Sequence, residues 1–310
     1  MAAYQELYRT GELRARVERA KAMLAECHLC PRHCGANRLA GEKGKCRTAG
    51  QAMVSSYGPH FGEEAPLVGR HGSGTIFFTF CNLRCIFCQN YTISQLGEGS
   101  PVSPKELAGM MLSLQAKGCH NINLVSPTHV VPFILEALEL AVGGGLSLPL
   151  VYNTGGYDSL ETLKLLDGVV DIYMPDMKYA DAKVGERFSG IRDYPEINRA
   201  AVKEMHRQVG DLELDEAGVA QRGLLVRHLV LPNRLAGTEA VVRFLAREVS
   251  ANTYLNIMAQ YHPCYQAFDI PELARPISQR EFAEAVEMAH RQGLHRLDER
   301  PSLPLRLILG

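Results

Sequence analysis

Six short runs rich in β-branched and aromatic residues alternate with helical patterns along residues 75–260, and this alternation constrains the fold more than any other feature. The runs are TIFFTF, INLVS, LPLVYN, VVDIYM, LLVRHLVL and TYLNIMAQ. Strands separated by helices usually form one parallel sheet with crossover helices. Six β/α units are too few for a closed eight-stranded barrel, so we expect an α/β fold built as a partial, TIM-like (β/α)6 barrel. In such a sheet, the loops that follow the strands meet at the carboxyl edge, where functional sites gather.

Local signals mark where the helices of these units begin and end. Three stretches match a capping box, in which a polar residue and an acid three positions later cap each other: Ser103–Glu106, Asp158–Glu161 and Ser278–Glu281. Pro132 suits the first turn of a further helix. Three helices should end at glycines, namely Gly118, Gly168 and Gly293. The stretch LELDEAGVAQRG predicts a hairpin before the fifth strand, with DEAG as its turn.

The first seventy residues do not join this alternation. They begin with an amphipathic helical pattern that runs to about Glu26, continue with the cysteine-rich stretch CHLCPRHCGANRLAGEKGKC, and end in a glycine-rich lead-in. We therefore predict two parts. Residues 1–70 form an N-terminal helix and a metal-binding segment, and residues 71–310 form the partial-barrel domain.

The composition excludes several classes of protein. Hydrophobic residues make up 46% and charged residues 22% of the chain, and the net charge is -1, so the basic excess of a nucleic-acid binder is missing. No window approaches the roughly eighteen consecutive apolar residues of a membrane span, and the charged start does not fit a signal peptide. We expect a cytoplasmic protein that binds neither nucleic acid nor membrane. In a reducing compartment, its nine cysteines would serve metals or catalysis rather than disulfides.

Cys81, Cys85 and Cys88 stand close together after the first predicted strand, in the sequence FTFCNLRCIFCQN. Thiolates are soft ligands that select zinc, copper(I) or iron–sulfur clusters. A structural zinc ion and an electron-transfer cluster usually take four protein ligands, whereas three cysteines leave one iron of a cubane free to bind a small molecule. A zinc knuckle or a disulfide loop is the alternative interpretation of this spacing.

The spacing C-x3-C-x2-C, with the aromatic Phe87 before the last cysteine, resembles the signature of the radical S-adenosylmethionine (SAM) enzymes. From about Gly72 to the sixth strand, the chain is similar to the pyruvate formate-lyase activating enzymes, and more closely to a PflA-like branch of that family. The resemblance implies that the three cysteines hold a 4Fe–4S cluster and that its free iron binds SAM. An electron donor such as flavodoxin or ferredoxin would then drive cleavage of SAM to a 5′-deoxyadenosyl radical.

The same resemblance implies which residues contact SAM. The place of the family's Gly-Gly-Glu stretch reads VSPTH here, so Ser126 and Thr128 would stand in for the acid that receives the SAM amino group. YNTGGYD resembles the family's Thr-Asn-Gly region and indicates Asn153, and YMPDMKY resembles its Asp-x-Lys element and indicates Asp176 and Lys178. A cation beside a bound carboxylate is most effective where water is excluded. The alternative for the last two residues is a solvated ion pair at a strand end.

Two further stretches complete the implied pocket. VRHLVLP resembles the family's ribose-contact region and indicates Arg227 or His228. NIMAQYHP belongs to the sixth unit and is expected to bring four polar side chains to the mouth of the pocket: Asn256, Gln260, Tyr261 and His262.

Four more cysteines precede the three-cysteine motif: Cys27, Cys30, Cys34 and Cys46, spaced C-x2-C-x3-C-x11-C. Glycines between them let the chain turn back on itself. Four soft ligands make a closed zinc site or a second iron–sulfur cluster, and the spacing does not separate the two. The alternative is that these cysteines pack without binding a metal.

We therefore predict a radical SAM enzyme that cleaves SAM reductively and abstracts a hydrogen atom from a substrate. The resemblance indicates a glycine of a partner glycyl-radical enzyme as that substrate. A second hypothesis replaces the partner protein with a small molecule or a peptide. A third, from another class, is a zinc-bound interaction protein without catalysis, and analysis for iron and sulfide would separate it from the first two.

Overall fold

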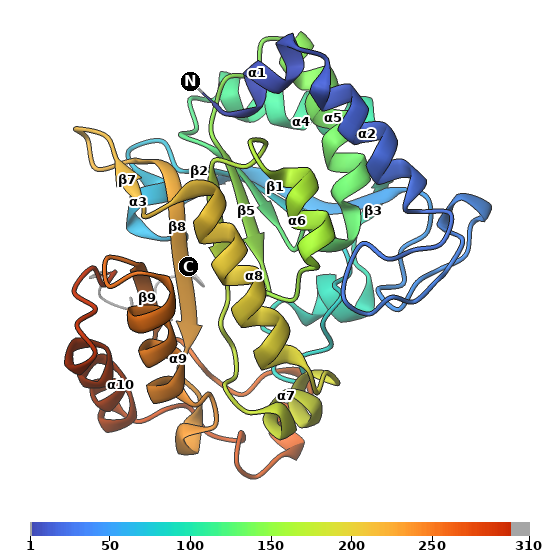
Figure 1. Cartoon of the computed structure of the whole chain (residues 1–310). Coiled ribbons are helices and arrows are strands. Elements are labelled where there is room, and N and C mark those ends of the chain that lie inside the picture. Colours follow the sequence, from blue (N-terminus) through green and yellow to red (C-terminus); the bar gives the residue numbers. More distant parts are fainter. Residues whose placement is uncertain (1, 299–310) are drawn as a thin grey trace.

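The six predicted strands all form and lie side by side as one parallel run. In the computed structural model, which describes residues 2–298, their order is β2-β4-β5-β6-β8-β9 (Figure 1). The last residues of the second predicted domain, 299–310, lie outside the described residues. The strands are β1 (Ala52–His60), β2 (Ser73–Phe78), β3 (Ser100–Val102), β4 (Ile122–Val125), β5 (Leu150–Thr154), β6 (Ile172–Pro175), β7 (Glu213–Leu214), β8 (Ala220–Leu229) and β9 (Tyr254–Met258).

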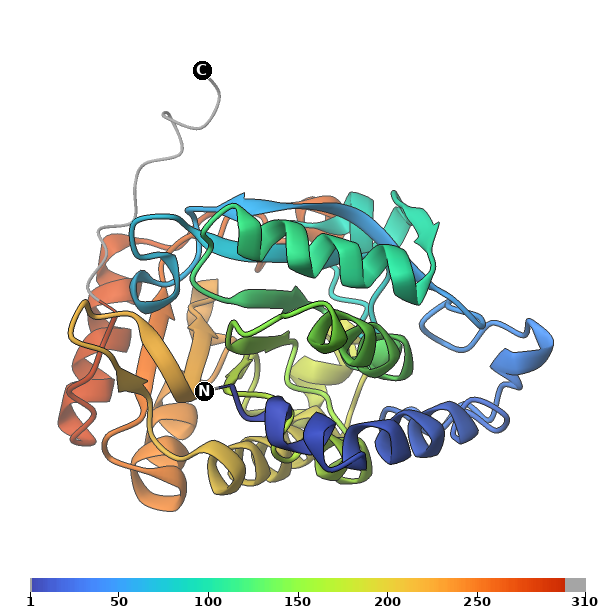
Figure 2. The same ribbon diagram turned by 90° about the horizontal axis from the view of Figure 1, so that it is seen from above.

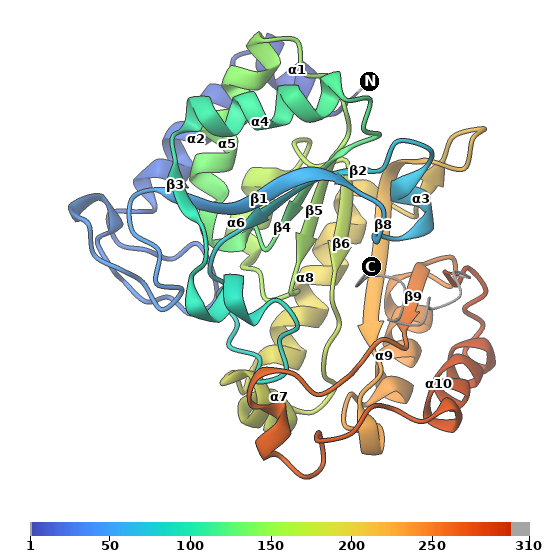
Figure 3. The same cartoon turned by 180° about the vertical axis from the view of Figure 1, so that it is seen from behind.

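Three strands extend the parallel run. β1 pairs antiparallel with β2, and β3 pairs antiparallel with β1, an extension that was not predicted from the sequence. β7 forms the predicted hairpin with β8. The result, over the described residues, is a mixed sheet of nine strands that does not close (Figure 3). This confirms the expected α/β fold with a partial barrel.

Helices wrap the outside of this sheet, as Figure 2 shows from above. The crossover helices α4, α5, α6, α8 and α9 connect successive parallel strands, and α10 packs on α9. Their faces bury one large core against the sheet. No helix in the described part of the chain is long and apolar enough to cross a bilayer. The helices are α1 (Tyr4–Arg9), α2 (Glu12–Ala22), α3 (Ala65–Val68), α4 (Pro104–Ala116), α5 (Val131–Gly143), α6 (Leu160–Leu166), α7 (Ala182–Ser189), α8 (Tyr194–Val209), α9 (Thr238–Phe244) and α10 (Gln279–Arg291).

The N-terminal helical pattern forms two helices rather than one. Gly11 adopts a left-handed φ of 78°, which ends α1 and starts α2, and α2 stops at Ala22, short of the predicted Glu26. Both helices pack against α5, and the Tyr4 hydroxyl donates a hydrogen bond of 2.7 Å to the Leu148 carbonyl. The prediction failed at Gly11 because a glycine inside a helical pattern is compatible with either continuation or a break.

The predicted capping boxes hold at two helices and fail at the third. Ser103 and Ser278 both exchange side-chain and backbone hydrogen bonds with the acid three residues later. The box at Asp158 was wrong, because α6 is capped by Ser159, whose hydroxyl accepts from the Thr162 amide. Asp158 lies in the interior instead. The predicted helix ends hold, since the three predicted glycines follow their helices with φ values of 74° to 89°.

The inside of the barrel is divided into an apolar floor and a polar layer. Val151, Ile172 and Leu225 form the floor near the starts of the strands. Because side chains alternate along a strand, residues two positions further on face the same interior at a higher level. Asn153 on β5 and Arg227 on β8 occupy this higher level. The polar layer therefore lies toward the carboxyl ends of the strands.

Candidate functional site

The three-cysteine loop leaves the sheet at the carboxyl end of β2. Cys85 is buried, Cys81 and Cys88 are half-buried, and none of the three forms a disulfide. Phe80, directly before Cys81, has a φ of 69°, a left-handed conformation that costs a non-glycine residue about 1–3 kcal/mol. Ser126 at the end of the neighbouring β4 has a φ of 58°. Strained backbone thus occurs at both strand ends that border the loop.

Each sulfur of this loop has a polar neighbour. The Leu83 amide donates to Cys81 Sγ over 3.4 Å, the Ser189 hydroxyl donates to Cys85 Sγ over 3.0 Å, and Ser94 Oγ lies 3.1 Å from Cys88 Sγ. Burial raises the pKa of Cys81 to about 12, and it also raises the pKa of Cys88. Hydrogen-bonding groups therefore lie beside all three sulfurs. For Cys81 and Cys88, whose raised pKa favours the thiol, bound metal cations would supply the stabilisation that the thiolate needs.

A buried ionic network stands next to this loop at the ends of β5, β6 and β8. Asp176 Oδ2 accepts from Lys178 Nζ at 2.6 Å, and its Oδ1 accepts from Arg227 Nε at 2.8 Å. Arg227 Nη2 donates to Asn153 Oδ1 at 2.7 Å. Four of the six predicted SAM contacts, Asn153, Asp176, Lys178 and Arg227, are thus joined in one chain of hydrogen bonds.

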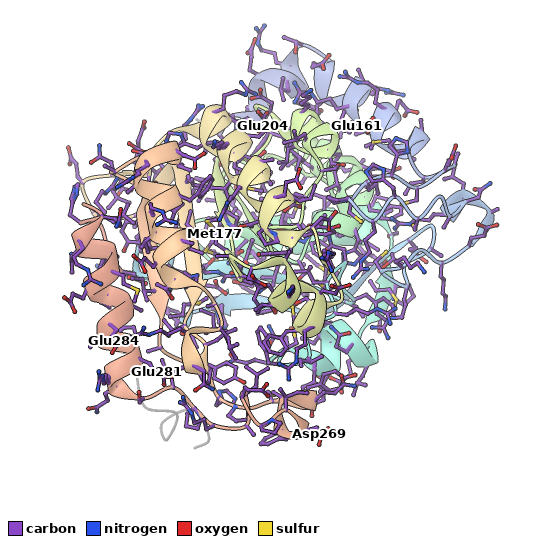
Figure 4. All side chains as sticks on the ribbon, turned by 60° about the horizontal axis from the view of Figure 1, so that its bottom comes forward. Glu161, Met177, Glu204, Asp269, Glu281 and Glu284 are labelled. Atoms are coloured by element: carbon purple, nitrogen blue, oxygen red, sulfur yellow. The ribbon has the colours of Figure 1, made fainter. Side chains whose placement is uncertain are left out.

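The charges in this network stabilise one another. Burial raises the pKa of Asp176, but Arg227 and Lys178 outweigh that effect and hold it below its usual range. Burial lowers the pKa of Lys178, and its neighbour Asp176 more than restores it. The Lys178 ammonium also favours the thiolate forms of Cys81 and Cys88. The network is therefore charged at neutral pH and close enough to the loop to act on its sulfurs. In Figure 4, which brings the carboxyl ends of the strands forward, Met177 marks its position near the centre of the molecule.

Two buried acids, Glu63 and Glu64, lie near Arg227 and extend the ionic network. Neither was predicted from the sequence. They lie in the segment between β1 and α3. Glu64 Oε1 accepts from Asn256 Nδ2 on β9 at 2.9 Å and lies 4.0 Å from Arg227 Nε. Burial raises the pKa of Glu64. The acid thus spans the open seam of the barrel, between the last strand and the segment that precedes β2. The pair GluGlu before Pro66 resembles an exposed first turn in the sequence, and no pattern there signals burial.

Several polar atoms in this layer have no partner among the described residues. Glu64 Oε2 and both side-chain polar atoms of Asn123 on β4 are buried without a hydrogen bond. A buried polar group without a partner costs about 1–3 kcal/mol, so these positions favour a polar ligand or water in the barrel.

Thr128, another predicted contact, belongs to a separate cluster that also contains Thr154 at the end of β5. Thr128 and Thr154 both donate to the Asp158 carboxylate at 2.7 Å, and Tyr152 donates to it at 3.0 Å. Burial raises the pKa of Asp158, while these three hydroxyls oppose the rise. The Thr128 hydroxyl therefore already donates its hydrogen bond to Asp158. Ser126 is half-buried at the end of β4, where its amide donates to the Asn153 carbonyl at 2.8 Å.

The residues predicted for the mouth of the pocket divide between two places. Asn256 lies inside β9, opposite Arg227, rather than at the mouth. Tyr261 is buried with its ring 5.9 Å from that of Phe87, and the Gln260 carbonyl accepts from Gln89 at 3.0 Å. The segment after β9 therefore lies across the three-cysteine loop. Its 3-10 turn ends at Asp269, at the lower edge of Figure 4.

His262 and His228 differ in their surroundings. His262 is half-buried, with its Nδ1 3.4 Å from Gln89 Nε2 in the loop. His228 is fully buried on the opposite face of β8 from Arg227, between the Met177 carbonyl and the Thr238 hydroxyl. Of the two alternatives on β8, only Arg227 joins the ionic network.

The four upstream cysteines lie in one loop between α2 and β1, which projects to one side in Figure 2. Cys27, Cys30 and Cys46 are buried and Cys34 is half-buried. Over residues 2–298, no three His, Cys, Asp or Glu side chains are arranged as ligands of a single metal ion.

The donor set fits the groups that the sequence resemblance implies. Three thiols on one loop, each beside a hydrogen-bond donor, suit a cluster that keeps one iron open. The charged network beside them offers both a cation and acceptors to the amino and carboxylate groups of SAM. When bound, the cluster and SAM supply the one-electron chemistry, and this chain supplies the binding, the orientation and the exclusion of water.

Two curated relatives cover most of the chain. The uncharacterized protein MJ0674 of Methanocaldococcus jannaschii is 33% identical over 93% of this chain and 81% of its own length. The uncharacterized protein MJ0808 of the same organism is 25% identical over 86% of this chain and 78% of its own length.

Solved structures resemble the fold at low identity. A radical SAM methyltransferase from Sphaerobacter thermophilus matches 71% of this chain and 64% of its own, with 14% identity and a TM-score of 0.48. HydG, a maturase of the FeFe-hydrogenase, matches 70% of this chain and 48% of its own, with 14% identity and a TM-score of 0.49. The family model of the radical SAM superfamily matches residues 75–210, which contain the three-cysteine loop and the first four parallel strands. Residues 75–210 of the chain are therefore a domain of the radical SAM superfamily, whose members use a 4Fe–4S cluster and SAM.

Proposed function

We propose that this protein cleaves SAM reductively at the cluster held by Cys81, Cys85 and Cys88 and uses the resulting 5′-deoxyadenosyl radical to abstract a hydrogen atom from a bound substrate. The observation that carries the proposal is the position of a charged, buried network directly beside a loop of three free thiols. A closed structural metal site would need a fourth protein ligand, and it would not need a charged network beside it.

The network residues position SAM in this proposal. Lys178 binds the SAM carboxylate, because its ammonium is buried and lies within reach of the cysteine loop. Asp176 holds Lys178 and Arg227 in place through its two oxygens. Arg227 and Asn153 face the ribose, and Ser126 and Thr128 line the side where the SAM amino group lies. The Thr128 hydroxyl already donates to Asp158. In this proposal, Thr128 therefore acts by holding the segment after β4 in place and not by a hydrogen bond from its hydroxyl to SAM.

The substrate that the sequence resemblance favours is a glycine of a partner glycyl-radical enzyme. The second candidate is a small molecule or a peptide, and one observation favours it. The segment after β9 lies across the cysteine loop, with the ring of Tyr265 stacked 5.1 Å from that of Tyr91 and the Gln266 amide bonded to the Ile86 carbonyl at 2.9 Å. Because this segment covers the entrance to the site, a small molecule or an extended peptide can reach the loop more easily than the surface of a folded partner protein.

A flavodoxin or ferredoxin supplies the electron, and we place the reaction in the cytoplasm because a reducing compartment keeps such thiols free. The test is anaerobic reconstitution of the cluster followed by reduction in the presence of SAM. The protein should release 5′-deoxyadenosine and methionine in equal amounts, and a Cys85→Ala variant should release neither. A fully loaded cluster that leaves SAM intact would refute the proposal. Electron paramagnetic resonance (EPR) of a candidate glycyl-radical partner then distinguishes the two substrates, since only the first predicts a radical on that partner.

A further inference from the structure

The loop between α2 and β1 turns back on itself twice, which brings cysteines from different parts of the loop near one another. The Cys27 amide donates to the Ala36 carbonyl at 3.0 Å, and the Gly35 amide donates back to the Cys27 carbonyl at 3.1 Å, which brings Cys27 beside Cys34. A second turn returns the chain, because the Arg47 amide donates to the Gly44 carbonyl at 2.8 Å. This turn places Cys46 near Cys34, since both sulfurs lie beside Gly44.

Gly44 leaves the space in which two of the sulfurs lie. A Cβ at this position would stand 3.0 Å from Cys34 Sγ and 3.6 Å from Cys46 Sγ. The first distance is closer than a side-chain carbon normally approaches another atom. The glycine is therefore required by the sulfurs and not by its backbone conformation.

Arg38 is a fully buried cation beside these cysteines. Its Nη1 donates to the His129 carbonyl at 2.9 Å and lies 3.8 Å from Cys27 Sγ, its Nε donates to the Ala49 carbonyl at 3.0 Å, and its Nη2 has no partner. Among the described residues, no carboxylate forms an ion pair with it. Burying a guanidinium without an anion is costly, so a negative charge is expected nearby. Four thiolates around a thiophilic metal carry such a charge.

We propose that Cys27, Cys30, Cys34 and Cys46 form a second, anionic metal–thiolate centre, that Arg38 is its buried counter-cation, and that the centre braces the three-cysteine loop. The metal is a thiophilic one, either zinc or the iron of a second iron–sulfur cluster. This centre goes beyond the proposed function, because its existence does not depend on whether SAM is cleaved.

Three arginines carry the bracing, and each lies within two residues of a cysteine. Arg32, in the stretch between Cys30 and Cys34, donates to the Asn82 carbonyl beside Cys81 at 2.6 Å. Arg84 donates in the opposite direction, to the Lys45 carbonyl beside Cys46, at 3.2 Å.

The third arginine reaches the far end of the loop. Arg47, next to Cys46, donates to the Ser94 carbonyl at 3.1 Å and to the Gln95 carbonyl, and its guanidinium lies over the Phe80 ring at 4.8 Å. Ser94 is the residue whose hydroxyl contacts Cys88 Sγ. Metal binding by the four upstream cysteines would therefore fix the positions of Arg32 and Arg47, which hold the two ends of the three-cysteine loop.

Metal analysis of the anaerobically reconstituted full chain tests the centre. Wild type should hold metal beyond one cubane per chain: extra zinc identifies a closed ion site, and doubled iron and sulfide identify a second cluster. Cys30→Ala and Gly44→Ala should lose only this additional metal. Cys119→Ala is the matched control, since Cys119 is a buried cysteine outside both groups. Wild type without additional metal, or a Cys30→Ala variant that keeps it, would overturn the proposal.

Chelator competition tests the counter-cation. Arg38→Met should weaken retention of the additional metal about 10–100-fold, the usual effect of removing a group that supports metal ligands, and Arg38→Lys should recover part of it. Arg14→Met, at an exposed position of α2, should retain the metal like wild type. Equal retention in Arg38→Met and Arg14→Met would remove Arg38 from this role. If Arg38→Met does not fold, the Cys30→Ala and Gly44→Ala results decide the proposal.

Hydrogen exchange tests the bracing without using activity. In Cys30→Ala, the amides of residues 81–96 should exchange faster than in wild type, whereas those of α10 should be unchanged. Unchanged exchange in residues 81–96 would show that the second centre, even if present, does not brace the loop. Because metal content and exchange are measured without SAM, failure here is distinct from failure of the proposed function.

Discussion

Replacing Arg227 by methionine should destabilise the protein through the charges it leaves behind. Arg227 contacts Asp176 at 2.8 Å and Asn153 at 2.7 Å, and within residues 2–298 it is the one cation that forms an ion pair with the buried Glu64, at 4.0 Å. Removing one partner of a buried pair costs about 3–5 kcal/mol. Asp176 keeps Lys178, so most of the loss should come from Glu64.

A double-mutant cycle isolates that contribution. Glu64→Gln removes the negative charge, and the amide keeps its bond to Asn256. The cost of Arg227→Met should therefore fall in the Glu64→Gln background by about 1–3 kcal/mol. Burial raises the pKa of Glu64 and the charge of Arg227 lowers it, so without Arg227 this pKa rises further. A folded-state pKa above the unfolded one means that stability is lost as the pH increases, so Arg227→Met should lose more at pH 8 than at pH 6.

The assay is urea unfolding of the four metal-free proteins under reducing conditions, followed by circular dichroism and by fluorescence. The two probes must agree for the free energies to be comparable. If the double variant loses the full sum of the two single losses, Glu64 does not sense Arg227 and the explanation is wrong.

Three further predictions concern single sites. His228 is fully buried, and burial lowers its pKa to about 4. A histidine whose pKa is lower in the folded state costs stability as the pH falls through the unfolded value of about 6.5. Between pH 7 and pH 5, the free energy of unfolding of wild type, measured with urea, should therefore fall by about 2 kcal/mol more than that of His228→Gln. Gly156 has a φ of 75°, and a Cβ there would stand 2.2 Å from the Asp176 carbonyl oxygen; Gly156→Ala should lower the melting temperature far more than Gly145→Ala, which has a φ of 95° but open space. Asp176→Asn should weaken SAM binding, measured by equilibrium dialysis of the reconstituted protein, because Lys178 and Arg227 lose the anion that orients them; unchanged binding would remove Asp176 from the site.

Much of the fold could be predicted because its signals are local. The strand runs form β2, β4, β5, β6, β8 and β9, since a parallel strand covered on both faces is mostly apolar. The serines at 103 and 278 cap their helices because the box depends on only four consecutive residues. β1 escaped prediction because AMVSSYGPH contains a glycine and a proline, and its place in the sheet depends on β2, a distant partner.

The site could be predicted only where a motif marks it. Cys81 and Asp176 follow recognisable strands, Arg227 lies near the end of another, and parallel strands place their ends together. Glu64 and Asp158 could not be found in this way, because each is buried through contacts with residues far along the chain or in another turn. In the sequence, both acids stand where an exposed first turn of a helix is expected, and only the folded structure shows that they are buried.

EPR of the reduced, reconstituted protein tests the central claim most directly, because it reports on the open iron itself. A cluster held by Cys81, Cys85 and Cys88 should give a reduced cubane signal that changes on addition of SAM, and Cys85→Ala should lose that signal. A signal in wild type that is the same with and without SAM would contradict the claim that this loop leaves an iron free for the cosubstrate.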